Sequence, residues 1–179
     1  WRGHVIMGGM FKEQDWFEYL EPTMRDLVEE AYYLLDREEM GGEELIDYSF
    51  VVFPMAKAYE GFVKKFLHNI GLISEKTYLS KHFRIGRSLN PSLPAKYRNG
   101  WWLFDDLQRM CEKTDDAEYK KFPRLMWKAW REGRNMIFHY FAGRERLVSL
   151  EEARKLVDGF REVMEMSVKC RVMLKSPKD

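Results

Sequence analysis

Cysteine is scarce in this sequence, with two residues in 179, and its scarcity excludes several kinds of protein. Cys111 and Cys170 lie far apart, and neither has a second cysteine or a histidine at the spacing of metal ligands. The four histidines are scattered as well. We therefore expect no structural metal site and no cofactor. Two free, buried thiols are the expected state of these cysteines, as in proteins of the reducing cytoplasm.

Neither sign of charge dominates, and long apolar runs are missing. The 30 Lys and Arg residues nearly balance the 29 Asp and Glu residues, which leaves a formal net charge of +1. A protein that coats nucleic acid with an overall basic surface is therefore disfavoured, and any contact with RNA or DNA must be local. No run of about 18 apolar residues occurs, so we expect no membrane span. The chain begins at Trp1 with neither an initiator Met nor a signal-peptide pattern. We interpret it as a fragment of something longer, or as a chain whose true start is missing.

What the sequence does contain is a strong helical pattern. Hydrophobic residues make up 45% of the chain and aromatic residues 15%, which is ample for a packed core. Apolar residues recur at spacings of three and four, and nothing predicts a strand. We predict an all-α bundle of about five main helices, at roughly 13–39, 45–70, 101–113, 115–142 and 149–174, with a short helix near 74–82. Residues 1–44 would form an N-terminal helical segment and residues 45–179 a helical domain, together one compact unit.

Two residues mark helix ends within this pattern. Pro22 predicts a kink or a new first turn inside the first helix. Ser149 and Glu152 have the spacing of a capping box, with Ser149 as the N-cap of the last helix.

The most informative stretch is Arg-Asn-Met-Ile-Phe-His at 134–139, directly after Gly133. On a helix Arg134 and His139 do not share a face, whereas Asn135 and His139 do. Gly133 favours a kink or a fresh helix start, and a new helix N-terminus would offer free N–H groups to an anion. The apolar neighbours predict a partly buried His139. Guanidinium, amide and imidazole together can bind a phosphodiester and move its protons, although such a pairing also occurs by chance.

Glu60 is the second unusual residue. It is the one ionisable position in a stripe of the 45–70 helix whose other members are Phe53, Ala56, Val63, Leu67 and Ile70. An unpaired carboxylate that faces a core is costly, so Glu60 should pair with a cation or a hydrogen-bond donor, and Arg134 is a candidate. The alternatives are a glutamate at the edge of the stripe that reaches solvent, or a structural pair with another arginine.

These residues resemble a known family. Arg134-Asn135-x3-His139, late in an all-helical chain, resembles the R-x4-6-H motif of the HEPN ribonucleases, in which a polar residue typically follows the arginine. The segment 58–67, Ala-Tyr-Glu-Gly-Phe-Val-Lys-Lys-Phe-Leu, resembles the acidic helix in the C-terminal domain of the RNase LS toxins of the RnlA type. The likeness covers residues 45–172 and leaves residues 1–40 unexplained.

The resemblance implies a HEPN-like fold and a metal-independent endoribonuclease, either a toxin or a defence nuclease. Arg134, His139 and Glu60 would be catalytic, with Asn135 in support. The 2′-OH of RNA would attack the adjacent phosphorus, and the product would carry a 2′,3′-cyclic phosphate. The family likeness also implies a homodimer and an antitoxin or inhibitor protein as partner.

Weaker signals lie in the irregular region 71–100. Lys81, Arg84, Arg87 and Arg98 alternate with aromatic residues there, and such a mixture can hold single-stranded RNA. The alternative is ordinary loop charge beside aromatic residues that cover the core. Trp127, Trp130 and Arg131 are interpreted as core and rim.

Two other functions stay open at this point. One is a non-catalytic HEPN-like module that only dimerises or binds a partner or a nucleotide. The other is an all-helical protein unrelated to HEPN, in which Arg134 and Glu60 form a structural pair.

Overall fold

All regular structure in the described part of the chain is helical. The computed structural model describes residues 11, 13–41, 44–140, 142–143 and 146–174, with the backbone alone for 172–174. The α-helices are α1 (Asp15–Tyr19), α2 (Pro22–Glu39), α3 (Ser49–Asn69), α4 (Glu75–Tyr78), α5 (Ile85–Ser88), α6 (Phe104–Glu112), α7 (Ala117–Trp130) and α8 (Leu150–Leu174). A 3-10 turn spans Ala95–Tyr97, and a π-helical turn spans Arg131–Asn135. The prediction of an all-α bundle is confirmed.

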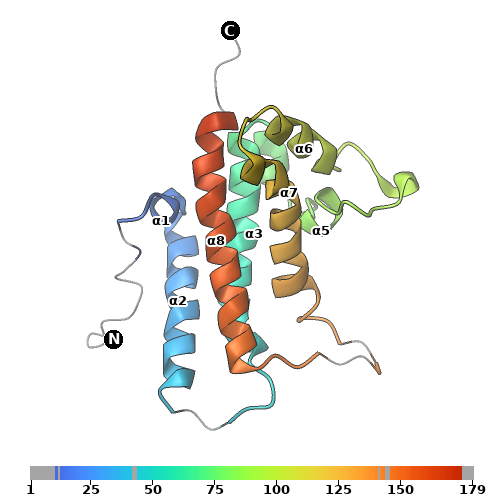
Figure 1. Cartoon of the computed structure of the whole chain (residues 1–179). Helices are drawn as coiled ribbons and strands as arrows, with labels where there is room; N and C mark the ends of the chain where they lie inside the picture. The colour runs from blue at the N-terminus through green and yellow to red at the C-terminus, as the bar shows by residue number, and fades with distance from the viewer. Residues whose placement is uncertain (1–10, 12, 42–43, 141, 144–145, 175–179) are drawn as a thin grey trace.

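Helix α3 is the centre of the bundle. It lies beside α8, with α2 on one side of the pair and α7 on the other (Figure 1). Its Tyr59, Phe62 and Phe66 side chains are fully buried. The Tyr59 hydroxyl donates to the Met126 carbonyl of α7 at 2.9 Å, and its ring lies 4.6 Å from that of Phe160 on α8. One aromatic side chain thus links α3, α7 and α8.

The structure has helix starts at the two positions that Pro22 and Ser149 predict. Pro22 occupies the first turn of α2, so the first predicted helix is divided into α1 and α2. The Ser149 hydroxyl accepts the Glu152 backbone N–H at 3.2 Å, which confirms the N-cap of α8. The Glu152 carboxylate does not complete the box, because it pairs with Arg146. In the irregular region, α4 lies within the predicted 74–82 helix, while α5 and the 3-10 turn were not predicted.

Both cysteines are free and buried, as expected, but the fold brings them together. The hydrogen bond between the thiols and their burial raise the pKa of Cys111, whereas the same bond lowers that of Cys170. The end of α6 is therefore anchored against α8.

No helix in the described ranges is long and apolar enough to cross a membrane.

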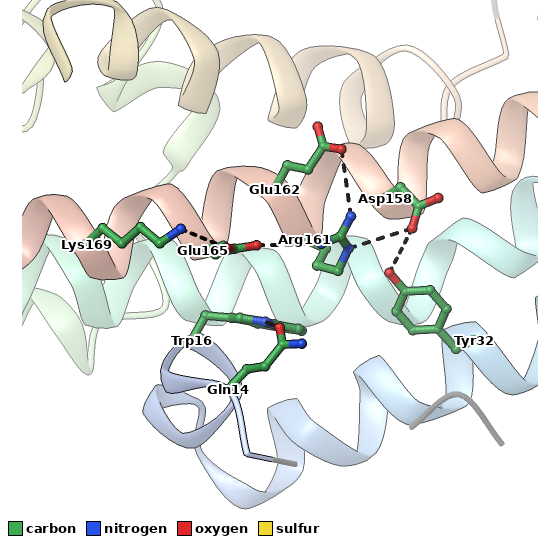
Figure 2. A network of polar contacts seen from close by, with 8 residues as sticks. All are labelled: Gln14, Trp16, Tyr32, Asp158, Arg161, Glu162, Glu165 and Lys169. Atoms are coloured by element: carbon green, nitrogen blue, oxygen red, sulfur yellow. Dashed lines mark hydrogen bonds and ion pairs between the residues drawn. The ribbon is translucent and has the colours of Figure 1, made fainter. Parts of the chain in front are cut away.

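A polar network on α8 ties it to α2. Arg161 reaches the carboxylates of Asp158, Glu162 and Glu165 within 3.8 Å (Figure 2). The buried Tyr32 of α2 donates its hydroxyl hydrogen to Asp158 at 2.9 Å. Burial, and then the neighbouring Asp158 carboxylate, raise the pKa of Tyr32 well above its usual value.

The Tyr32→Phe variant should lose stability and should also respond less to alkali. A hydrogen bond to a charged group contributes about 1.5–3 kcal/mol, so the free energy of unfolding should fall by about that amount at neutral pH. Because the folded pKa is raised, the stabilisation is present below about pH 10 and is lost as the pH rises above it. Urea unfolding between pH 7 and 11 should therefore show a shallower alkaline decline for the variant. Tyr97→Phe, at a half-exposed ring, is the control and should match wild type.

Candidate functional site

The segment 134–139 lies at the end of α7, where the helix widens. After Trp130 the backbone enters the π-helical turn, and the Met136 N–H donates to the Arg131 carbonyl at 2.9 Å. No regular helix follows in the described residues before α8. The predicted helix over 115–142 therefore ends at Asn135, and Asn135 and His139 do not share a helical face. Wide turns of this kind occur frequently at functional sites.

Gly133 explains this departure. A Cβ atom at Gly133 would lie 2.4 Å from the Phe160 ring of α8, so only glycine lets the turn approach α8 so closely. The glycine therefore ends the helix by packing and does not start a new one. Arg134 consequently lies at a helix C-terminus, where exposed carbonyls disfavour an anion and favour a cation. Any anion bound there must be held by side chains, not by free N–H groups of a helix start.

Arg134 stacks on an aromatic ring. Its guanidinium carbon lies 5.7 Å from the centre of the Trp130 ring. Among the described residues it forms no ion pair, so its charge is available to a ligand. His139 is exposed, which contradicts the expectation of partial burial. The neighbouring chain explains the exposure: Ile137 is buried and Phe138 packs edge-on against Phe53 at 5.5 Å, after which the chain turns outward.

Glu60 does not face the core. Its side chain is 33% exposed and its carboxylate lies 4.0 Å from the Lys64 ammonium, one turn later on α3. Within the described chain no ion pair joins Glu60 to Arg134. Phe53 is 54% exposed, so the outward stripe of α3 includes it together with Lys57, Glu60 and Lys64. The prediction that Phe53 lies in a buried stripe is wrong, and Glu60 matches the alternative of a glutamate at the edge of the stripe that reaches solvent. Both face outward because α2, α7 and α8 cover the other sides of this central helix.

The three arginines predicted to bind RNA in the irregular region 71–100 donate hydrogen bonds to backbone carbonyls of that same region. Arg84 donates to the Lys81 carbonyl, and Arg87 donates to the Tyr97 carbonyl at 3.0 Å. Arg98 donates to the Leu93 carbonyl at 2.8 Å, and its guanidinium lies 3.9 Å from the centre of the Trp102 ring. Lys81 is exposed. Of the four cations predicted to bind RNA, Arg87 also lines the cavity described next.

This cavity, of about 610 Å³, lies between the α5 region and the end of α7. One wall is Trp127, Trp130, Arg131 and Asn135, and the other is Gly86, Arg87, Asn90, Ser92 and Leu93. None of these residues is acidic. The structure thus brings Asn135 of the motif together with Arg87, two residues predicted for separate reasons.

Two stacked indoles form the aromatic part of the cavity. The Trp127 and Trp130 rings lie 5.4 Å apart at an interplanar angle of 19°. Trp130 lies so close to Gly86 that a Cβ there would be 2.3 Å from its ring. The Trp130 Nε1–H is buried and has no acceptor in the described part of the chain. From the sequence these tryptophans are expected as core and rim. Their spacing of three residues, directly before Arg131, is the signal that also indicates the lining of a cavity.

No group of three or more metal-ligating side chains occurs among the described residues. Arg131, Arg134 and Asn135 lie in the π-helical turn at the end of α7, and His139 follows four residues after Asn135. The cavity lining includes Arg131 and Asn135 but neither Arg134 nor His139. Comparison with models of protein families, with curated proteins and with solved structures finds no match for this chain.

Proposed function

We propose that the chain is a metal-independent endoribonuclease of the HEPN type, with Arg134 and His139 at its centre. The observation that carries the proposal is the position of these residues. Arg134 belongs to the same turn as Arg131 and Asn135, which line the cavity, and the exposed His139 follows within one short segment. Neither Arg131 nor Arg134 is neutralised by an ion pair in the described chain. A phosphodiester would therefore find cations and a proton-transfer group at one place.

The chemistry needs only these side chains. His139 takes the proton of the RNA 2′-OH as the 2′-oxygen forms a bond to phosphorus, and a proton is returned to the 5′-oxygen as its bond to phosphorus breaks. Arg134 donates hydrogen bonds to the charge-rich phosphorane. Asn135 supports the phosphate from the cavity side. The products are a 2′,3′-cyclic phosphate and a free 5′-OH.

In this proposal Glu60 has a conditional role. Its carboxylate pairs with Lys64, so it would orient Arg134 or His139 only after a second copy or the substrate changes that pairing.

A homodimer would complete the site by supplying a second His139, one imidazole as base and the other as acid. Exposed apolar side chains near the motif fit such an interface. Tyr140 is 80% exposed and Leu147 is 58% exposed, and both lie on the segment between α7 and α8. The two loops at this end are joined, because the Tyr48 N–H donates to the Val148 carbonyl at 2.8 Å.

A toxin or defence nuclease of this kind would act on RNA in the cytoplasm, and an antitoxin or inhibitor protein would hold it inactive. The second candidate is a non-catalytic HEPN-like module that dimerises or binds a partner. The Glu60–Lys64 pair favours this candidate, since no carboxylate of the described residues is bonded to Arg134.

Wild-type protein should cleave single-stranded RNA in EDTA and leave 2′,3′-cyclic phosphate ends. The active species should elute at twice the 21.6 kDa mass of one chain. Size-exclusion chromatography with light scattering, followed by an RNA gel assay of each fraction, measures both properties at once. Cleavage that requires added divalent metal would refute the mechanism. A dimer that cuts no RNA would favour the non-catalytic module.

A further inference from the structure

We infer that the cavity between α5 and the end of α7 binds a nucleotide, with its base against the Trp127–Trp130 pair and its phosphate on Arg131 and Arg87. Binding follows from the lining of the cavity alone. A role as subsite for the cleaved RNA strand rests on the proposed function.

The lining supplies positive charge without a counter-charge. Arg131 is exposed and forms no ion pair with any described residue. Arg87 donates one guanidinium N–H to the Tyr97 carbonyl, and its remaining N–H groups can donate to a phosphate. None of the described residues that line the cavity is a carboxylate. A guanidinium fork suits the oxygens of a phosphate, because it can donate two parallel hydrogen bonds.

The aromatic wall suits a base. Stacking on an aromatic side chain is the usual way in which an unpaired base is held, and it tolerates any base. Trp127 is only half-buried, so the indole pair retains accessible surface. A cavity of about 610 Å³ is within the range of small-ligand sites, roughly 300–1,000 Å³.

Polar groups in the lining could fix the orientation of the base. The Asn135 side chain has no hydrogen-bond partner in the described chain, and it carries both a donor and an acceptor. The buried Trp130 Nε1–H also lacks an acceptor. A buried donor without an acceptor is costly, so this indole is a polar group whose hydrogen bond the described chain leaves unmade.

Binding can be measured without cleavage. A fluorescein-labelled 2′-O-methyl RNA hexamer has no free 2′-OH, so a ribonuclease cannot cut it, and its anisotropy reports binding. Competition by AMP distinguishes a site for a free nucleotide from a site for one nucleotide within an RNA strand. If AMP competes as tightly as unlabelled hexamer, the cavity takes a free nucleotide; if the hexamer binds more tightly, it takes one nucleotide of a strand.

Arg131→Ala should weaken binding about tenfold, because a hydrogen bond to a charged phosphate is lost. Trp127→Leu should also weaken it about tenfold, because the stacking surface is lost while the apolar packing remains. The matched control is Lys128→Ala, which removes one positive charge from an exposed position of α7, three residues before Arg131 and outside the cavity lining. It should change affinity about twofold or less.

The inference is overturned if neither probe binds, or if Lys128→Ala weakens binding as much as Arg131→Ala does. The ribonuclease proposal is judged separately. If the hexamer binds at the cavity and native RNA stays intact, only the ribonuclease proposal fails. If native RNA is cut and Arg131→Ala binds like wild type, only the nucleotide cavity fails.

Discussion

Replacing His139 with alanine should slow RNA cleavage by about 100- to 10,000-fold, which is the typical contribution of a general acid or base. His139 is the only histidine in the segment 134–139, and the proposed mechanism assigns the proton transfer to it. Because the side chain is exposed, its truncation should leave the fold intact. A gel assay in EDTA measures the rate, and a thermal melt verifies folding.

The matched control is His82→Ala, which removes another exposed imidazole outside the segment and should cut at the wild-type rate. Arg134→Ala should cost an amount comparable to that of His139→Ala, because the donors to the phosphorane are lost. Arg134→Lys should restore part of the rate, since an ammonium keeps the charge and lacks the planar fork. Normal cleavage by His139→Ala would remove this histidine from the mechanism.

Replacing Phe160 with alanine should destabilise the fold by about 3–5 kcal/mol, the usual cost of removing a buried aromatic ring. Phe160 is 1% exposed, and its ring lies 4.6 Å from that of Tyr59 and directly against Gly133. The free energy of unfolding in urea measures the loss.

Gly133→Ala tests the same contact from the other side. Its Cβ would meet the Phe160 ring at 2.4 Å, and overpacking of this kind costs about 1–3 kcal/mol. In the Phe160→Ala background the penalty should largely disappear, because the ring is gone, and a double-mutant cycle measures that coupling. Gly159→Ala is the control: nothing lies within 4 Å of its Cβ position, so this change within α8 should stabilise the protein by about 0.5–1 kcal/mol. An unchanged Gly133→Ala penalty in the Phe160→Ala background would refute the packing argument.

Local patterns in the sequence were enough to place most of the helices. The spacing of apolar residues located α2, α3 and α8, Pro22 marked the start of α2, and Ser149 marked the start of α8. Each of these signals acts within a few residues of the chain, so sequence alone can reveal it.

The end of α7 could not be predicted in the same way. It depends on the contact between Gly133 and Phe160, which are brought together only by the fold. The environment of Glu60 was predictable in part, since Lys64 is four residues later and such pairs are common on helices. The cavity could not be predicted, because helical spacing alone does not show that Trp127 and Trp130 meet the loop after α5.

The π-helical turn also sets the angle about the axis of α7 at which the following segment leaves the helix. A wide turn holds one residue more than an α-helical turn, and each residue of an α-helix advances by about 100°. Deleting Glu132 would restore α-helical geometry and swing Asn135 by about that angle, away from the cavity wall it now forms. The helix before the turn is fixed by its packing on α3 and α8, so a change in length at this turn would redirect the following segment, His139 included, while leaving the core of α7 in place.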